Sequence, residues 1–377
     1  MIYFDNASTT KASKSAVEAM VRVLSENFGN PSSLHALGIE AEKEIKQAEK
    51  TILKILSATD EKIVFTSSGT EANNLAIRGA VYSRKGRFNG LVFDAAQHES
   101  VTASAKRLQK EGFNVTAAAP LSNGSADLQK IVSAVDEKTA MVSLTLVNNE
   151  TGSITDVSSA VKKIKAKNKN TLVHVDAVAA FCKREINFKK LGADIMTISA
   201  HKVHGPKGIG AVIFKKDVRL EPLIYGSSQQ NNLKPGTEPV SSIAAFSAAA
   251  KESYEKMNDA NQRAKEISGY LREELLKIEG ITLNSPSDAS DYLVNFSTNS
   301  VKSEVMLHFL EENGIYVSSG SACSKGKNSH VLEGMGLKRE SVLSAVRVSL
   351  SDENTLTEVK KFIETLKKGL SVLIKSF

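Results

Sequence analysis

At 377 residues, the chain exceeds the length at which one hydrophobic core stops growing, which argues against a lone small binding module and favours two domains. Hydrophobic residues at 41% and charged residues at 24% are typical of globular proteins and exclude a disordered or fibrous protein. The net charge is +7, but the lysines are scattered and aromatic residues reach only 6%, so we expect no direct binding of nucleic acid.

The sequence carries no targeting or membrane signal that we can identify. No apolar run approaches the roughly 18 residues needed to cross a bilayer, and the start MIYFDNASTT differs from a signal peptide. Two cysteines, Cys182 and Cys323, are too few for a disulfide framework and are typical of a reducing compartment. We therefore expect a cytoplasmic protein without membrane contact.

Strands and helices are predicted to alternate over the first part of the chain. Short apolar runs rich in β-branched residues predict buried strands at 63–68, 91–96, 114–119, 141–147, 172–178, 194–200 and 211–214. Amphipathic stretches predict helices at 34–56, 70–84, 100–111, 127–135 and 156–167. This alternation predicts an α/β domain with a mostly parallel sheet.

The rhythm changes after Pro239. A long helical pattern at 241–278 precedes strands at 292–298, 315–319 and 345–350, with helices from Ser303 and over 355–374. This order predicts a smaller α+β domain at the C-terminal end. We expect a large domain at 14–250, and a small domain made of 1–13 and 251–377. No linker rich in Pro, Gly or Ser separates them, which predicts an extensive interface.

Polar side chains follow the predicted strands at the place where ligands bind in open α/β sheets, beyond the carboxyl ends of the strands. These groups are Ser68-Gly69-Thr70, Gln97-His98, Asn148-Asn149-Glu150, Asp176 and Ser199-Ala200-His201-Lys202. Because polar groups end five predicted strands, the sequence predicts a ligand site along that edge of the sheet.

The residue types at this edge indicate a particular cofactor. Backbone N–H groups at the start of the Thr70 helix suit a phosphate. Asp176 follows an apolar run, where a carboxylate is costly unless a cation meets it. Lys202 ends a strand and precedes the glycine-containing loop GPKGIG. A reactive lysine, a buried aspartate and a phosphate cradle are together what pyridoxal 5'-phosphate requires. Dinucleotide and P-loop motifs do not occur.

Each of these side chains also has an ordinary structural interpretation. Asp176 could cap a helix or pair with a cation, and His98 could be a capping histidine. The spacing of His201 and His204 could suggest zinc, but no third ligand has a suitable spacing, so we expect no metal. Cys182 is most simply a small buried hydrophobic residue.

Eight motifs in one order give the chain a resemblance to a known family. The chain resembles the cysteine desulfurases of the NifS/IscS type, a branch of the class V aminotransferases, which are fold-type I pyridoxal phosphate enzymes. The matching segments are YFDNASTT at 3, GNPSSLHALG at 29, SSGTEANN at 67, VNNETG at 147, HVDAV at 174, SAHKVHGPKGIGA at 199, SSGSAC at 318 and VRVSL at 346.

The resemblance implies roles for particular residues. Lys202 would bind the cofactor covalently and carry the Cα proton, Asp176 would hold the ring nitrogen, and His98 would stack on the ring and transfer protons. The implied cofactor contacts are Gly69, Thr70, His98, Asn148, Asp176, Ser199, His201 and Lys202, with Thr237 supplied by the second subunit of a homodimer.

The resemblance also implies a reaction. Asn148 and Arg347 would hold the carboxylate of the substrate L-cysteine, and the enzyme would release L-alanine and leave a persulfide on Cys323. Without the resemblance, Arg347 could pair with a carboxylate at a sheet edge, and Cys323 could be a spectator thiol. The persulfide would pass to a sulfur acceptor, either a tRNA sulfurtransferase or an iron–sulfur scaffold protein.

Two alternative interpretations of the function remain open at this point. The chain could be an aminotransferase or a selenocysteine or cysteine-sulfinate lyase, for which Cys323 would be dispensable. It could also be a weakly active paralogue that serves as a scaffold. Ala179 stands where the family usually has glutamine, and Asn231 and Lys234 stand where it commonly has arginines. Only seven residues separate Cys323 from Val331, which predicts a short sulfur-delivery loop.

Overall fold

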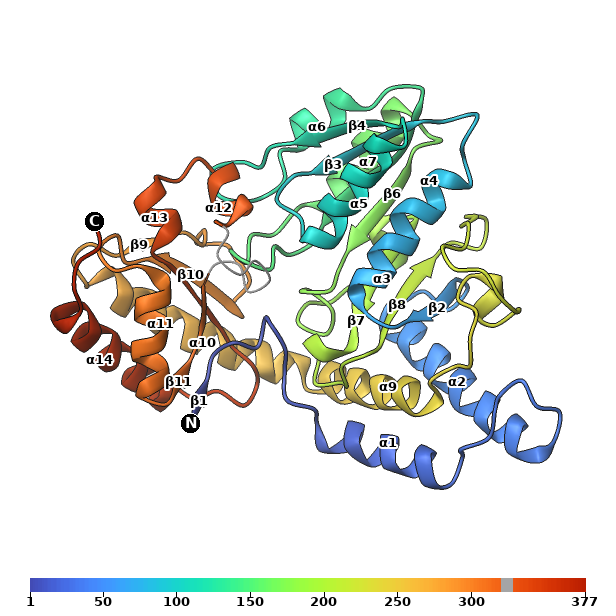
Figure 1. Cartoon of the computed structure of the whole chain (residues 1–377), viewed down its shortest axis with the longest axis horizontal. Coiled ribbons are helices and arrows are strands. Elements are labelled where there is room, and N and C mark those ends of the chain that lie inside the picture. Colours follow the sequence, from blue (N-terminus) through green and yellow to red (C-terminus); the bar gives the residue numbers. More distant parts are fainter. Residues whose placement is uncertain (320–327) are drawn as a thin grey trace.

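The computed structural model describes residues 1–319 and 328–377, and it contains two units, each built around a sheet (Figure 1). Cys323 lies outside the described residues. The larger sheet lies in the first unit, and the second unit contains a four-stranded sheet and a short two-stranded sheet, in which the start of the chain pairs with a later segment. None of the helices in these two ranges is long and apolar enough to cross a membrane.

The larger sheet contains seven strands within residues 62–214, in the order β2-β8-β7-β6-β5-β3-β4. Only β8 runs antiparallel to its neighbours β2 and β7, and the other pairs are parallel. The predicted class, a mostly parallel α/β sheet with a smaller C-terminal unit, is therefore confirmed. The strands are β2 (Lys62–Thr66), β3 (Gly90–Asp94), β4 (Asn114–Ala118), β5 (Thr139–Thr145), β6 (Leu172–Asp176), β7 (Ile195–Ser199) and β8 (Gly210–Phe214).

Helices cover both faces of this sheet because its strands are apolar on both sides. On β3, Val92 packs in one core, whereas Leu91 and Phe93 pack in a second core on the opposite face. The helices of this unit are α1 (Lys14–Ser25), α2 (Ala36–Ile55), α3 (Gly69–Asn74), α4 (Ala80–Tyr82), α5 (Glu99–Lys110), α6 (Leu128–Ala134), α7 (Val157–Lys167), α8 (Phe188–Leu191) and α9 (Val240–Glu255). A π-helical turn, Leu75–Gly79, joins α3 to α4 within the helix predicted at 70–84.

The second unit contains a small sheet and the start of the chain. β1 (Ile2–Tyr3) pairs with β11 (Ile315–Tyr316), while the described part of the other sheet has the order β12-β13-β10-β9. Phe4 and Phe362 pack edge to face in its core, with ring centroids 5.9 Å apart. The remaining strands are β9 (Thr282–Leu283), β10 (Leu293–Ser297), β12 (Ser318–Ser319) and β13 (Ala345–Ser349); the helices are α10 (Met257–Leu276), α11 (Ser303–Glu312), α12 (His330–Gly334), α13 (Arg339–Leu343) and α14 (Leu356–Val372).

The helical pattern predicted at 241–278 corresponds to two helices, which meet at Lys256. There α9 ends and α10 begins, and Lys256 has φ −88° and ψ −6°. Buried residues of α9 pack in the core of the large sheet, whereas those of α10 pack in the core of the small sheet. The break therefore lies where the apolar face changes partner. The domain limits expected from the sequence stay a prediction, which this division of the cores supports.

Candidate active site

A cavity of about 770 Å³ lies where the carboxyl ends of the central strands meet the small sheet. Leu293 and Arg347 of the small sheet form part of its wall. Its size suits a cofactor together with a small substrate. The predicted site residues that line it are Gly69, Thr70, His98, Asp176, Ser199, His201, Lys202 and Arg347.

Lys202 reaches the cavity from a short 3-10 turn, η2 (Ala200–Lys202), directly after β7. Its Nζ donates hydrogen bonds to the carbonyl oxygens of Ala7, at 2.5 Å, and Ser8, at 2.7 Å. The segment between β1 and α1 therefore helps to orient the amine. The amine of Lys202 thus lies just beyond the end of β7, at the cavity, where it is placed to react with the carbonyl group of a bound ligand.

Asp176 is the last residue of β6 and is 6% exposed. Its Oδ2 accepts a hydrogen bond from Nδ2 of Asn73 at 2.8 Å, and its Oδ1 accepts one from the backbone N–H of Val178 at 2.9 Å. Both carboxylate oxygens are therefore held in place by donors from the chain. Such a carboxylate is suited to hold the protonated nitrogen of a pyridine ring.

The start of α3 and the end of β7 form a cradle with space for a phosphate. Ser68 caps α3, since its Oγ accepts a hydrogen bond from the N–H of Glu71 at 3.1 Å. A Cβ at Gly69 would approach the Cβ of Ser199 to 3.3 Å, so a side chain there would fill the cradle. The buried hydroxyl of Ser199 has no hydrogen-bond partner among the described residues. The residues present therefore fit the phosphate of pyridoxal phosphate.

The close approach of β8 to this cradle gives a test. A Cβ at Gly210 would lie 2.8 Å from the carbonyl carbon of Ser68 and 3.0 Å from the nitrogen of Gly69. Because both are backbone atoms, Gly210→Ala must displace the turn, and we expect about tenfold weaker binding of pyridoxal phosphate, equivalent to about 1.4 kcal/mol. Fluorescence titration of the apo protein measures this, with Gly269→Ala as control because its Cβ meets no atom within 4 Å. Unchanged affinity in Gly210→Ala would contradict the cradle.

Two histidines, His98 and His201, line the cavity. His98 caps α5, because its Nδ1 accepts a hydrogen bond from the N–H of Ser100 at 3.1 Å. The capping interpretation and a place at the ligand cavity therefore both hold for His98. Burial and the neighbouring charge of Lys202 lower the pKa of His201 to about 4. His201 consequently offers a neutral imidazole N–H to a ligand.

Arg347 brings the small sheet into the site. Only 2% of the side chain is exposed, and its Nη2 pairs with Asp5 at 3.0 Å and donates to the hydroxyl of Ser8 at 2.7 Å. Its Nη1 donates to the carbonyl oxygen of Asn149 at 2.9 Å. Its Nε is buried and has no hydrogen-bond partner among the described residues. An arginine held in this way can bind a carboxylate in the cavity.

The structure does not bring Asn148 to the cavity. Its Nδ2 donates to the carbonyl oxygen of Ala96 at 2.9 Å, and its Oδ1 accepts hydrogen bonds from the N–H groups of Glu150 and Thr151. The hydrogen-bonding groups of the Asn148 side chain are therefore occupied by nearby backbone groups. The next residue, Asn149, lines the cavity instead. The motif NNETG contains both asparagines and gives no signal to choose between them.

Lys183 and His330 also line the cavity and had no signal in the sequence, whereas Glu150 is among the polar groups predicted at the strand ends. Burial, together with the nearby Arg347, lowers the pKa of Lys183 to about 8, so this second lysine can exchange a proton near neutral pH. Burial also raises the pKa of Glu150, although the Ser329 hydroxyl that donates to it acts in the opposite direction. His330 follows Ser329 and places its Nε2 2.9 Å from the carbonyl oxygen of Gln97.

Some predicted residues lie elsewhere. Thr237 is exposed and does not line this cavity, and Cys323 is outside the described residues. Ala179, which replaces a glutamine of the resembled family, does line it. Lys234 lies 4.0 Å from Glu71, which connects its loop to the cradle helix.

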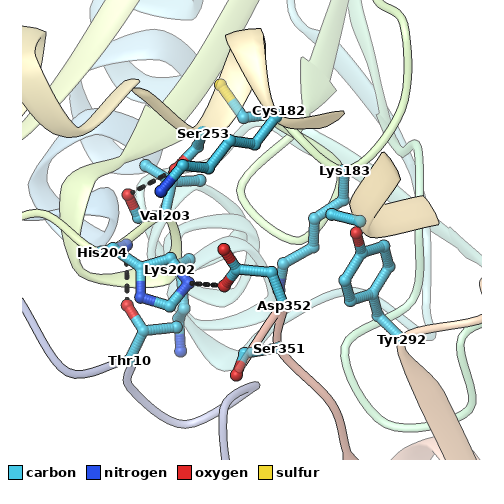
Figure 2. Close-up of a pocket in the computed structure, with 12 residues that line it drawn as sticks. Thr10, Cys182, Lys183, Lys202, Val203, His204, Ser253, Tyr292, Ser351 and Asp352 are labelled. Carbon is cyan, nitrogen blue, oxygen red and sulfur yellow. Dashed lines mark hydrogen bonds and ion pairs between the residues drawn. The ribbon is translucent and has the colours of Figure 1, made fainter. Parts of the chain in front are cut away.

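Behind Lys202 lies a second cavity of about 30 Å³ between the two units (Figure 2). There Nε2 of His204 lies 3.3 Å from Oδ1 of Asp352, and the backbone N–H of His204 donates to the hydroxyl of Thr10 (Figure 2). His204 is thus used between the units, and within residues 1–319 and 328–377 no three His, Cys, Asp or Glu side chains gather as metal ligands would. Cys182 also lines this cavity, where burial raises the pKa of its thiol.

Comparison with known proteins gives consistent matches along the chain. The profile described as aminotransferase class-V matches residues 2–362. Cysteine desulfurase IscS of Clostridium botulinum is 34% identical over 373 residues, covering 97% of this chain and 94% of that protein. Cysteine desulfurase IscS 1 of Archaeoglobus fulgidus is 35% identical over 369 residues, covering 97% of this chain and 96% of that protein.

Solved structures agree with the sequence matches. A NifS-like protein aligns with a TM-score of 0.93 and 33% identity, covering 99% of this chain and 100% of the other. SspA in complex with cysteine aligns with a TM-score of 0.82 and 29% identity, covering 94% of this chain and 100% of the other. The chain therefore belongs to the class V aminotransferase family, and within that family it is similar to cysteine desulfurases of the NifS and IscS type.

Proposed function

We propose that the protein is a pyridoxal phosphate-dependent cysteine desulfurase. The observation that carries this proposal is the meeting of Lys202, Asp176 and Arg347 around one cavity, to which Arg347 comes from a different sheet. Lys202 and Asp176 match the two reactive ends of the cofactor, and Arg347 matches the carboxylate of an amino acid. The similarity to cysteine desulfurases supports L-cysteine as that amino acid.

Each side chain has a task in this proposal. When bound, pyridoxal phosphate supplies an electron sink that stabilises a carbanion at the substrate Cα. Asp176 holds a proton on the ring nitrogen, Lys202 carries the Cα proton, and Arg347 orients the substrate carboxylate. His98 lies at the same cavity and transfers protons along the way.

The sulfur step falls to Cys323. Its thiolate forms a bond to the sulfur of L-cysteine, the bond between that sulfur and Cβ breaks, and the carbon takes up a proton. The products are L-alanine and a persulfide on Cys323. The lysines around it in SSGSACSKGK support a lowered thiol pKa.

One experiment separates this activity from its alternatives. Protein loaded with pyridoxal phosphate is incubated with L-cysteine and a reductant, and alanine and sulfide are measured. Equal amounts of alanine and sulfide support the proposal. Transamination of L-cysteine without sulfide, or release of alanine only from cysteine sulfinate or selenocysteine, supports another class V activity. If none of these substrates gives a product, the result supports a scaffold role.

We infer that the acceptor is a sulfurtransferase that thiolates tRNA. The segment from Ser324 to His330 limits the reach of Cys323, at most about 3.3 to 3.6 Å per residue, so the partner must bring its own cysteine close. The net charge of +7 suits a partner that handles RNA. A radiolabelled persulfide should pass faster to such an enzyme than to an iron–sulfur scaffold, and equal or faster transfer to the scaffold would contradict this inference.

We also infer that the protein is a homodimer. Exposed apolar side chains follow one face of α1, where Val17, Val21 and Leu24 are 50%, 58% and 61% exposed. A second copy that covers them could bring its exposed Thr237 to the phosphate cradle. We expect Val21→Asp combined with Leu24→Asp to give monomers in light scattering, with at least about tenfold weaker cofactor binding. Val372→Asp, at a position 60% exposed on α14, is the control, and a monomeric wild type would contradict the inference.

A further inference from the structure

A set of buried polar side chains surrounds Asp176, from β6, β7 and α3. His174 and Asp176 are two residues apart on β6, so their side chains leave the same face of the sheet. Thr197 on β7 is the register partner of Asp176. Asn73 on α3 contacts both strands. We call Asn73, Thr197 and His174 the Asp176 network.

Asn73 is the member that touches the carboxylate. Its Nδ2 donates to Oδ2 of Asp176 at 2.8 Å and to the hydroxyl of Ser100 at 2.9 Å. Its Oδ1 accepts a hydrogen bond from the hydroxyl of Thr197 at 2.6 Å. Both ends of the amide are therefore engaged, and the amide must keep its N–H groups directed at Asp176.

His174 completes the set and is fully buried. Its Nε2 lies 3.3 Å from the Thr197 hydroxyl oxygen, and its Nδ1 lies 2.9 Å from the Ser143 hydroxyl oxygen. The Thr197 hydroxyl hydrogen goes to Asn73 and the Ser143 hydroxyl hydrogen goes to Gln97, so each ring nitrogen of His174 faces a hydroxyl oxygen that can accept a hydrogen bond. Burial lowers the pKa of His174 to about 4, which leaves the ring neutral at physiological pH.

Two hydrogen bonds of the network run in one direction, toward the carboxylate. Thr197 donates to Asn73, and Asn73 donates to Asp176. Each bond polarises the next, and the effect is larger in a buried setting than in water. The series ends on a carboxylate, so its combined dipoles stabilise negative charge there. His174 lies beside this series, with its Nε2 3.3 Å from the Thr197 hydroxyl oxygen.

We propose that the Asp176 network directs the carboxylate of Asp176 at the ring nitrogen of bound pyridoxal phosphate, and that Thr197, acting through Asn73, is a positioning residue for the proton on that nitrogen. This inference rests on the proposed cofactor site. Without the Thr197 hydroxyl, the hydrogen bond from Asn73 to the carboxylate is weaker and less well directed, so the ring nitrogen holds its proton less firmly. The ring then loses positive charge and withdraws electrons less strongly.

Thr197→Val tests the proposal, because it removes one hydroxyl and keeps the shape of a buried β-branched side chain. Thr197→Ser restores the hydroxyl. Thr171→Val is a matched control, since Thr171 is also fully buried and donates to the carbonyl oxygen of Thr139 at the other end of β6. Each protein is loaded with pyridoxal phosphate carrying nitrogen-15 in its ring, and the chemical shift of that nitrogen is recorded. The affinity of each apo protein for the cofactor is measured in parallel.

We expect the ring nitrogen of Thr197→Val to shift toward the unprotonated position, with affinity and turnover of L-cysteine each about fivefold to tenfold lower. Thr197→Ser should return all three toward wild type, and Thr171→Val should leave the shift unchanged even if it lowers the unfolding temperature. A wild-type shift in Thr197→Val, or the same displacement in Thr171→Val, would overturn the inference. Failure of the wild type itself to bind pyridoxal phosphate would overturn the proposed function instead.

Discussion

Lys202→Ala protein should lack the Schiff-base absorption of the wild type, and borohydride should no longer attach the cofactor to the chain. In the wild type the amine of Lys202 enters the cavity from the end of β7. The amine both anchors the cofactor and carries the Cα proton in our proposal. Its removal should lower the rate of alanine formation from L-cysteine by about 10³-fold or more.

Lys183→Ala is the control for this change, since Lys183 is a second lysine in the same cavity with a pKa of about 8. Borohydride treatment followed by peptide mapping should still label Lys202 in that variant. Labelling of Lys183 in the wild type would contradict the assignment of Lys202. A wild type that stays colourless after reconstitution would contradict the cofactor itself.

Cys323→Ser protein should bind L-cysteine and change the absorption of the bound cofactor, but it should form no persulfide. A serine hydroxyl cannot take the sulfur, because its oxygen is a poor nucleophile toward sulfur and holds its proton at neutral pH. We expect alanine formation to fall by about 10²-fold or more, with little change in the concentration of L-cysteine that half-saturates the spectral change.

Cys182→Ala provides the comparison, because Cys182 is the other cysteine and its buried thiol has a raised pKa. Mass spectrometry should find the persulfide on Cys323 in that variant, as in the wild type. If Cys323→Ser releases alanine from L-cysteine at the normal rate, the protein is a lyase that does not need this thiol. The two variants together separate loss of the nucleophile from loss of fold.

Much of the fold and part of the site follow from the sequence. The strand runs are apolar on both faces, so their positions are visible without any long-range information, and parallel strands place their polar ends at one edge. That reasoning identifies Asp176 and Lys202 as neighbours of one cavity, and the structure brings them there. The family resemblance adds Arg347, which comes from a different sheet.

The parts that could not be predicted depend on three-dimensional packing. Asn148 and Asn149 have the same chemistry, and only the conformation of their turn decides which one faces the ligand. The helix predicted at 241–278 has a continuous amphipathic pattern, but its halves pack on different cores. The sequence around Lys183 has no feature that predicts burial of a lysine, so its burial is visible only in the fold.

Two of the charged groups in the cavity wall, Lys202 and Arg347, depend on the first few residues of the chain. Lys202 is held by the carbonyl oxygens of Ala7 and Ser8, and Arg347 pairs with Asp5, 342 positions away. During synthesis, the large sheet is complete long before Arg347 leaves the ribosome, and domains fold as they emerge. The N-terminal segment must therefore wait for β11 and β13 before it reaches its final place. A chain that ends before β13 lacks Arg347, and with it the group that would bind a substrate carboxylate in the proposed site.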